Sequence, residues 1–249
     1  MVSVLFSEAS AMVSQEGTFW SGVSDYFGAM FKKVGEIGLP TWIVLAVLVA
    51  AGALLLMMGR KRQSWNAATI SYAALAIALS FLLSHIRLYR MPQGGSVTVA
   101  SMLPLMLFSY AFGIVPGLVS GVAYGILEFF QEPFLLPIAP LYAVCQLLLD
   151  YIIAFGCIGL TAVFHGKKRK DTIALSCGIA LAAFLRFACS TASGVLFFAE
   201  YAGDQNPLIY SIVYNGSYML PEMLICIALG VAVGPRLCKI MYKSAKITR

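Results

Sequence analysis

Four ionisable side chains lie inside long apolar stretches, and these residues are the most able to do chemistry. They are Glu128, Asp150, Arg186 and Glu222. An ionised group near the middle of a membrane helix costs at least about 2.5 kcal/mol, so such groups pair with one another or face a polar interior. We expect an internal ion pair between Arg186 and one of the three acids. The other two carboxylates would then face an interior that opens outward, where a cationic ligand would suit them.

Aromatic and amide side chains accompany these acids. They are Tyr151, Tyr210, Tyr214, Asn215 and Tyr218. With 3.6 residues per helical turn, Asn215, Tyr218 and Glu222 fall on one face of the last apolar stretch. A carboxylate among aromatic rings suits a flat organic cation, through stacking and cation–π attraction. An aromatic belt at the membrane interface is the alternative, and it fits Tyr210 better than Tyr218.

Motifs for catalysis and for nucleotide binding are missing from the sequence. No phosphate-binding GxxxxGK[ST] loop, zinc-binding HExxH or nucleophile-bearing GxSxG occurs. The six cysteines stand singly, without a CxxC pair, and the only histidines are His85 and His165. We therefore expect no enzyme, no metal site and no cofactor. Active transport would draw its energy from an ion gradient or from partner subunits.

The composition places these residues in a lipid bilayer. Of the 249 residues, 60% are hydrophobic and only 11% are charged, whereas soluble domains average about 45–50% apolar and about 25% charged residues. This excludes a soluble enzyme and a free nucleic-acid binder. A spanning helix needs about 20 apolar residues. The apolar stretches predict seven spans: 41–58, 67–86, 97–112, a fourth that follows a tight turn at 113–116 and reaches 130, a fifth from Pro140 to 164, and then 172–199 and 208–233.

The predicted fold is an all-α integral membrane protein with one added helix followed by six. Residues 1–62 form an amphiphilic lead and the added helix, and residues 63–249 form a six-helix domain with a basic tail. The loop 89–96 contains a proline and paired glycines that would break a helix, so it is predicted to be a turn or a re-entrant element.

Basic residues predict the orientation. Twelve of the seventeen lie in residues 60–62, in residues 167–170 and in the tail after 235. Cytoplasmic loops are enriched in Lys and Arg. These three segments therefore predict a multi-pass protein of the cell membrane, with the N-terminus outside and the C-terminus in the cytoplasm.

Small residues recur every four positions in two of the predicted spans. The longer repeat consists of Gly113, Gly117, Gly121 and Gly125. Ala74 and Ala78 form a shorter repeat in the second span. Residues of this size let helix backbones approach closely, so we expect a packed helix face. A face beside a ligand is the alternative for the glycines.

Three separated motifs resemble a known family. They are Met91-Pro-Gln-Gly-Gly-Ser-Val-Thr98 followed by Ala-Ser-Met-Leu-Pro104, then Leu149-Asp-Tyr-Ile-Ile-Ala-Phe-Gly156, then Tyr210-Ser-Ile-Val-Tyr-Asn-Gly-Ser-Tyr-Met-Leu-Pro-Glu222. In this order they resemble the thiamine-binding S components of energy-coupling-factor (ECF) vitamin transporters. The resemblance covers roughly residues 67–235 and leaves residues 1–62 outside it.

The resemblance implies a six-helix membrane subunit that binds thiamine from outside. Such a subunit associates with a transmembrane coupling subunit and with two cytoplasmic ATPases, whose ATP hydrolysis drives release of the vitamin inward. The family's Ala-xxx-Ala motif for the coupling subunit is best matched by Ala74 and Ala78. The missing ATP-binding motif agrees with this division of labour.

The resemblance also implies which residues bind the ligand. The carboxylate of Asp150 would face the thiazolium ring, and the loop 89–96 would cover the site. Where the family has a histidine and a tryptophan on either side of a glycine, this chain has Ser190 and Phe198, so a thiamine-like ligand stays open beside thiamine. The full candidate set is Tyr89 as an aromatic cover, Glu128, Asp150, Tyr151, Ser190, Gly194, Phe198, Tyr210, Asn215, Tyr218 and Glu222.

A second hypothesis belongs to another class of protein. Glu128, Asp150 and Glu222 could serve as relays in an ion-coupled secondary transporter of organic cations. Such a protein would take up its substrate alone, without coupling or ATPase subunits.

Overall fold

The computed structural model describes residues 66–131, 140–165 and 171–244. The predicted lead and first spanning helix, residues 1–62, lie outside the described residues. Five helical segments of the described part are long and apolar enough to cross a membrane. They are α3 (Ala67–Ser84), α5 (Ile114–Gln131), the segment Val144–Phe164, α8 (Asp171–Phe197) and α9 (Pro207–Ser244). Together with the shorter apolar helix α4 (Leu103–Phe112), they confirm the predicted all-helical membrane fold.

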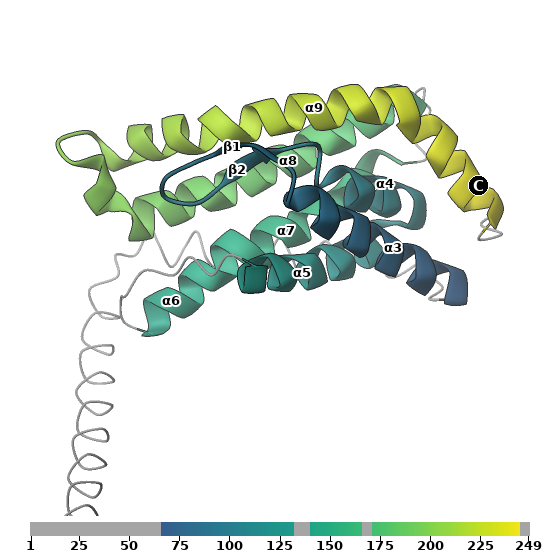
Figure 1. The fold of residues 1–249 in the computed structure, drawn as a ribbon, viewed down its shortest axis with the longest axis horizontal. Coiled ribbons are helices and arrows are strands. Elements are labelled where there is room, and N and C mark those ends of the chain that lie inside the picture. The colour runs from purple at the N-terminus through teal and green to yellow at the C-terminus, as the bar shows by residue number, and fades with distance from the viewer. Residues whose placement is uncertain (1–65, 132–139, 166–170, 245–249) are drawn as a thin grey trace, which may run out of the picture.

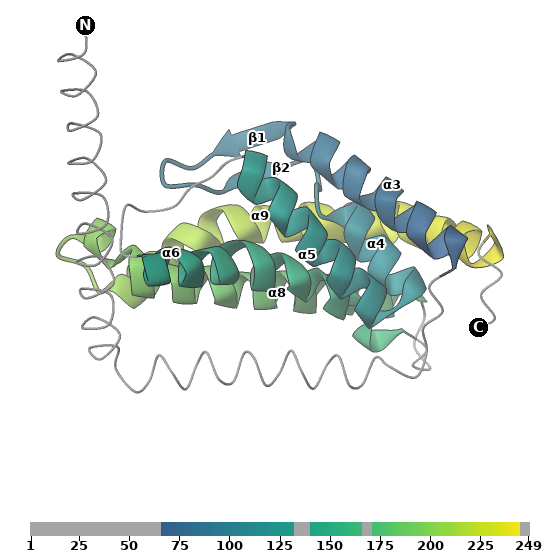
Figure 2. The same cartoon turned by 90° about the horizontal axis from the view of Figure 1, so that it is seen from below.

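The short helix α4 forms the centre of the core. All of its residues except Pro104 are buried, and Leu105, Met106 and Phe108 are at most 1% exposed. It packs against α3, α5, α9 and the 3₁₀ segment Cys157–Phe164. Helices α8 and α9 lie side by side along the length of the molecule (Figures 1 and 2). Because α4 is enclosed on all sides, its ten residues contribute packing surface rather than a face toward lipid.

Helix α3 separates a buried face from an apolar outer face. Its N-cap is Asn66, whose side chain accepts a hydrogen bond from the Thr69 amide at 2.8 Å. The buried face consists of Thr69, Ala73, Ala76, Ser80 and Ser84. The opposite face exposes Ile70, Leu75, Leu79 and Leu82, as well as both Ala74 and Ala78. Small polar and alanine side chains thus face the protein, and large apolar ones face outward.

The loop that follows α3 is a β-hairpin, which the sequence did not predict. Strands β1 (Arg87–Arg90) and β2 (Ser96–Thr98) pair in antiparallel fashion, and β2 packs on α9. Gly94 and Gly95, both with φ of +88°, form the turn. The helix predicted to begin at 97 begins at Leu103, because residues 96–98 are used by the strand. The predicted re-entrant or turn segment is thus a paired hairpin.

The segment between Pro140 and Phe164 changes its helical type along its length. It runs from α6 (Pro140–Leu147) through a π-helical turn, Leu148–Ile153, into the single turn α7 (Ala154–Gly156) and the 3₁₀ segment Cys157–Phe164. Single π-helical turns are rare and frequently mark functional sites. Asp150 and Tyr151 both lie in this turn.

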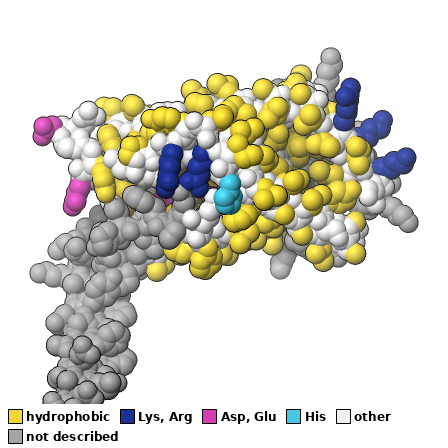
Figure 3. Space-filling view, in the orientation of Figure 1, with side chains coloured by type: hydrophobic (Ala, Val, Ile, Leu, Met, Phe, Trp, Pro, Cys, Tyr) yellow, Lys and Arg dark blue, Asp and Glu magenta, His cyan; other side chains and the backbone are white. Residues whose placement is uncertain are grey.

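Helix α9 is longer than predicted. The span expected over 208–233 continues to Ser244 and contains Pro221 and Pro235. Arg236, Lys239 and Lys243 therefore extend from a helix rather than from a separate tail. In the space-filling view, basic side chains lie at the end where α9 stops and also near the middle of this face, acidic ones lie at the opposite end, and hydrophobic ones cover much of the surface between (Figure 3).

The glycine repeat on α5 packs against the neighbouring backbone. A Cβ atom on Gly121 would collide with the carbonyl oxygen of Phe155, and one on Gly125 would collide with that of Tyr151. Gly117 lies in the same way against Ser109, whose hydroxyl donates to the Gly159 carbonyl at 2.7 Å. The expected close approach of helices is confirmed for Gly117, Gly121 and Gly125. Gly113 instead ends α4, before α5 begins, and Ala74 and Ala78 are exposed on α3.

Replacing Gly121 by Ala is expected to destabilise the protein. The added methyl group meets backbone rather than a flexible side chain, and overpacking of this kind costs about 1–3 kcal/mol. The measurement is the thermal unfolding temperature of the purified protein in detergent. The matched control is Gly216→Ala on α9, where the nearest atom, Phe187 Cε2, lies 3.9 Å from the added Cβ. Equal unfolding temperatures for the two variants would contradict the packing argument.

Candidate substrate-binding site

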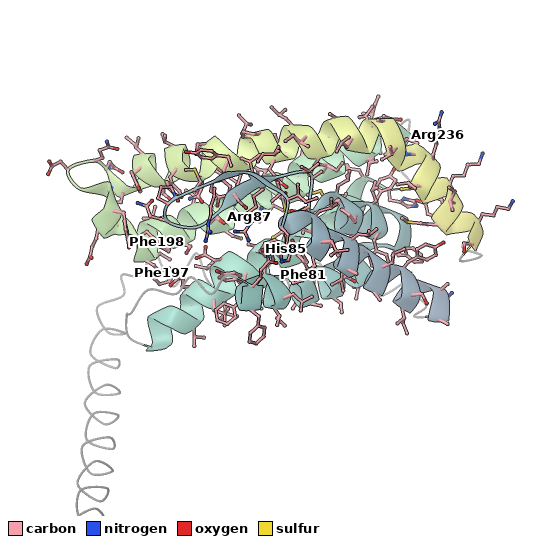
Figure 4. All side chains as sticks on the ribbon, in the orientation of Figure 1. Phe81, His85, Arg87, Phe197, Phe198 and Arg236 are labelled. Atoms are coloured by element: carbon pink, nitrogen blue, oxygen red, sulfur yellow. The ribbon has the colours of Figure 1, made fainter. Side chains whose placement is uncertain are left out.

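A cavity of about 160 Å³ lies among the hairpin, α5, the π-helical turn, α8 and α9. Figure 4 marks two of its lining residues, Arg87 at the start of the hairpin and Phe198 just after α8. The predicted residues that line it are Glu128, Asp150, Tyr151, Ser190, Gly194, Phe198, Tyr210, Asn215, Tyr218 and Glu222. The structure thus brings together every candidate binding residue of the sequence except Tyr89.

Helix α8 contributes residues at intervals of four. Arg186, Ser190 and Gly194 line the cavity from α8, as expected for one face of a helix, and Phe198 continues this spacing directly after the helix ends. Gly194 permits the close approach of α9, since a Cβ atom there would collide with the hydroxyl of Ser211. The small side chain at 194 therefore sets the spacing between the two helices that form this wall.

The π-helical turn presents Asp150 and Tyr151 to the cavity together. The hydroxyl of Ser193 on α8 donates to Asp150 Oδ2 at 2.7 Å, which fixes the carboxylate against α8. The extra residue in a π-helical turn widens the helix locally. Two successive side chains thereby line one cavity. A carboxylate held beside a phenol can accept a hydrogen bond from a ligand or face its positive charge.

Polar side chains of α9 form a chain of hydrogen bonds along the wall. Asn215 Nδ2 donates to the Ser211 carbonyl at 3.0 Å and to the Ser190 carbonyl at 3.3 Å. The Tyr218 hydroxyl donates to Asn215 Oδ1 at 2.9 Å. The amide of Asn215 therefore joins α8 to α9 and orients Tyr218 at the same time.

The carboxylate of Glu222 joins α9 to the hairpin. It accepts hydrogen bonds from the Thr98 amide and the Thr98 hydroxyl, each at 2.5 Å, and from the Ser101 hydroxyl at 3.4 Å. The side chain is 2% exposed. Although Glu222 lines the cavity, both of its oxygens are already bonded within the protein.

A second set of hydrogen bonds closes the tip of the hairpin over the cavity. The backbone amide of Gln93 donates to the Tyr214 hydroxyl at 2.8 Å. That hydroxyl in turn donates to the backbone carbonyl of Gly94 at 3.0 Å. The Tyr210 hydroxyl donates to Gln93 Oε1 at 2.9 Å. The rings of Tyr210 and Tyr214 stack with centroids 5.9 Å apart. The tip of the hairpin is thus held on α9 by two neighbouring tyrosines.

Comparison with known proteins identifies the family. The profile described as "Thiamine transporter protein" matches residues 70–241, which is more than half of the chain. The chain belongs to this family. The resemblance that the three motifs predict is therefore confirmed.

Two members of the thiamine transporter family are informative relatives. The chain is 34% identical to the thiamine transporter ThiT of Bacillus subtilis (strain 168) over 168 residues, which cover 60% of this chain and 81% of the relative. The solved structure of ThiT from Listeria monocytogenes matches with a TM-score of 0.56 and 22% identity, over 70% of this chain and 94% of that one. The second likeness supports the fold.

Tyr89, the predicted cover, does not reach the cavity in this family member. Its side chain is 61% exposed, and the hairpin lines the cavity with Gln93, Gly94, Gly95 and Ser96 instead. The predicted loop therefore lines the cavity through its turn and not through Tyr89. The side-chain amide of Gln93, next to the paired glycines, was the sequence signal for a residue that lines the cavity. A glycine turn lets the backbone and its neighbouring side chains approach another surface closely.

The predicted ion pair of Arg186 is absent among the residues that the structure describes. Its Nε atom is enclosed without a hydrogen-bond partner, and Nη1 contacts Met102 Sδ at 3.2 Å. The three acids are held by other donors: Glu222 by Thr98 and Ser101, Asp150 by Ser193, and Glu128 by Tyr124. The prediction was wrong because local hydroxyl and amide donors satisfy each carboxylate.

Proposed function

We propose that the chain captures thiamine, or a close relative of it, as the substrate-binding membrane subunit of an ECF-type importer. The observation that carries the proposal is the cavity lined by Asp150 and by tyrosines of α9, in a chain of the thiamine transporter family. A carboxylate and aromatic rings provide charge attraction and stacking for a flat cation such as thiazolium. The curated relative of this chain is itself named a thiamine transporter.

The proposed ligand includes thiamine-like vitamins and precursors as well as thiamine, because two residues of the cavity wall differ from the family pattern. The family pattern has an imidazole and an indole at the positions of Ser190 and Phe198, and both positions line the cavity here. A phenyl ring retains stacking but carries no N–H donor, and a serine hydroxyl replaces a ring with a small polar group. These exchanges alter the walls of the site without removing its carboxylate.

We infer that the chain acts without a catalytic site of its own and depends on partners for energy. The partners would be the transmembrane coupling subunit and two cytoplasmic ATPases. Ala74 and Ala78 support this, because they lie on the exposed face of α3, flanked by exposed Ile70, Leu75 and Leu79. Small residues on an apolar face allow another helix to approach closely in a membrane.

The orientation follows from the charges. The basic end of α9, together with residues 60–62 and 167–170, would face the cytoplasm. The hairpin and the exposed acids Glu200 and Asp204 would then face outward at the cell membrane, with the N-terminus outside. In this orientation the hairpin covers the cavity on the side from which a vitamin arrives.

Calorimetric titration of the purified full-length chain with thiamine tests the proposal. We expect saturable binding, and weaker binding of the separate pyrimidine and thiazole halves. No binding of thiamine or either half would contradict the proposed ligand. Uptake into liposomes by this chain alone, driven by a proton or sodium gradient, would instead support the secondary transporter. Uptake that requires added coupling and ATPase subunits would exclude it.

Replacing Ala78 by Phe is expected to abolish uptake and to leave thiamine binding intact. The bulky ring would keep the coupling subunit away from α3, while the cavity lies elsewhere. The measurements are thiamine binding to the isolated chain and uptake in cells that contain the partner subunits. Ala228→Phe, at an exposed alanine of α9, is the matched control. Equal uptake by the two variants would place the docking face outside the Ala74–Ala78 repeat.

A further inference from the structure

Two buried polar side chains, Gln146 and Ser193, contact Asp150 without lining the cavity. Each of them is 0% exposed, and neither belongs to the cavity wall. The Ser193 hydroxyl donates to Asp150 Oδ2 at 2.7 Å, and the Gln146 side chain is also hydrogen-bonded to this carboxylate. Since an ionised carboxylate only accepts hydrogen bonds, Gln146 donates through its NH₂ group. Asp150 therefore receives two donors from the interior of the protein.

The two donors reach Asp150 from different elements. Gln146 lies on α6, four residues before Asp150, which is a spacing at which side chains of one helix meet. Ser193 lies on α8, 43 residues beyond Asp150. The π-helical turn that carries the acid begins at Leu148, after Gln146. The carboxylate is thus held both by its own segment and by the neighbouring helix.

These hydrogen bonds act on the charge and on the direction of the carboxylate. Donors that bond to the ionised form of an acid favour that form over the protonated one. A carboxylate offers about four lone-pair sites, so two donors from the interior leave the remaining sites for a ligand in the cavity. The ligand then meets an acceptor whose position and charge are set before binding.

We propose that Gln146 and Ser193 are positioning residues that keep Asp150 ionised and directed toward the ligand. This deepens the proposed function and rests on it. Neither residue lines the cavity, so both act on the ligand through Asp150. The ligand group at this place is consequently a cation or a hydrogen-bond donor. An acceptor there would be repelled by the carboxylate oxygens.

Other ionisable groups surround Asp150, and they stay in place when either donor is replaced. Arg186 and Cys189 of α8 and Tyr218 of α9 interact with it electrostatically. The other charged groups of the cavity wall are Arg87 of the hairpin, Glu128 of α5 and Glu222 of α9. A difference in pH dependence between the wild type and a variant at Gln146 or Ser193 therefore reports the lost donor.

Double-mutant cycles test whether the two donors act through Asp150. Calorimetry would measure thiamine binding to Gln146→Met and to Ser193→Ala, each alone and combined with Asp150→Asn. Loss of a hydrogen bond to a charged group should weaken binding by roughly tenfold or more. In the Asp150→Asn background the charge is already gone, so either substitution should cost little further. Additive losses in both cycles would overturn the proposed role.

The pH profile of binding separates this role from a structural one. With one donor removed, Asp150 takes up a proton more readily. Thiamine binding should then be lost at a pH about one to two units higher than in the wild type. The loss is greatest at low pH and shrinks as the pH rises. Titration of the ligand itself is common to all chains and cancels in the comparison. An equal loss of affinity at every pH would contradict the inference.

Control variants remove buried polar groups that lie elsewhere. Ser80→Ala deletes a hydroxyl that is 0% exposed, and Gln131→Met deletes an amide whose oxygen accepts from Ser84. Neither Ser80 nor Gln131 lines the cavity, so both variants should keep the wild-type pH profile.

The outcomes also separate this inference from the function on which it rests. Thermal unfolding in detergent would establish that each variant is folded. Ser193→Ala is the smaller change and decides the test if Gln146→Met does not fold. Thiamine binding to the wild type, with the wild-type pH profile in both donor variants, would overturn the role of Gln146 and Ser193 alone. Absence of thiamine binding to the wild type would contradict both proposals.

Discussion

Replacing Asp150 by Asn is expected to weaken thiamine binding by roughly 10- to 100-fold, from the 1.5–3 kcal/mol of a charged hydrogen bond. The amide can still accept the hydrogen bond that the Ser193 hydroxyl donates at 2.7 Å, so the π-helical turn keeps its position against α8. What the variant lacks is the negative charge that we propose to face the ligand. The loss in affinity therefore reports charge recognition and not a change of fold.

Calorimetric titration at fixed ionic strength measures this effect. Asp204→Asn is the matched control, since Asp204 is exposed between α8 and α9 and does not line the cavity. It should bind thiamine as the wild type does. An Asp150→Asn variant that binds thiamine unchanged would remove Asp150 from the site. An unchanged unfolding temperature is expected in either variant.

Helical periodicity made much of the site predictable from the sequence. Asn215, Tyr218 and Glu222 follow the spacing of one helix face, whereas Ser190, Gly194 and Phe198 were predicted from the family resemblance. Once each stretch is helical, a single polar face must point inward, because lipid surrounds the others. The structure accordingly places all six residues around one cavity. Local spacing was sufficient for the three residues of α9, and the family resemblance supplied the other three.

The hairpin and the π-helical turn could not be predicted in the same way. Paired glycines indicate a break, but the partner of a strand depends on contacts across the chain. The register of β1 and β2 is irregular between Arg87 and Tyr89. An irregular register changes which side chains face inward, and Tyr89 is exposed where a cover was expected. The π-helical turn likewise inserts a residue that regular spacing does not anticipate.

The sequence also does not predict that the three acids have different hydrogen-bond partners. Each is a carboxylate in an apolar stretch, and spacing alone treats them as equivalent. Their donors decide their roles: Ser193 lies 43 residues from Asp150, Thr98 lies 124 residues from Glu222, and Tyr124 lies only four from Glu128. Two of these three partners are brought together only by folding. The same donors left Arg186 without the ion pair that charge counting predicted.

Replacing Glu222 by Gln is expected to accelerate thiamine release by roughly 5- to 100-fold, because a buried donor left unsatisfied costs about 1–3 kcal/mol. In the wild type, the carboxylate accepts from both the amide and the hydroxyl of Thr98 at 2.5 Å. The amide group of Gln offers one acceptor oxygen, and its NH₂ group faces a donor. The hairpin is then held on α9 chiefly by Tyr210 and Tyr214 at its tip.

Stopped-flow displacement of bound thiamine measures the release rate, and calorimetry measures the affinity. If Glu222 anchors the hairpin that covers the cavity, the loss of affinity should appear mainly in the dissociation rate, as for most changes at an interface. Glu200→Gln makes the same chemical change at an exposed glutamate and should leave both quantities unchanged. If Glu222 instead faced the ligand's charge directly, Glu222→Gln would resemble Asp150→Asn in affinity. Its association rate would then fall below that of the wild type by a factor that grows as the ionic strength is lowered. A release rate equal to that of the wild type would show that the hairpin does not depend on this anchor to stay closed.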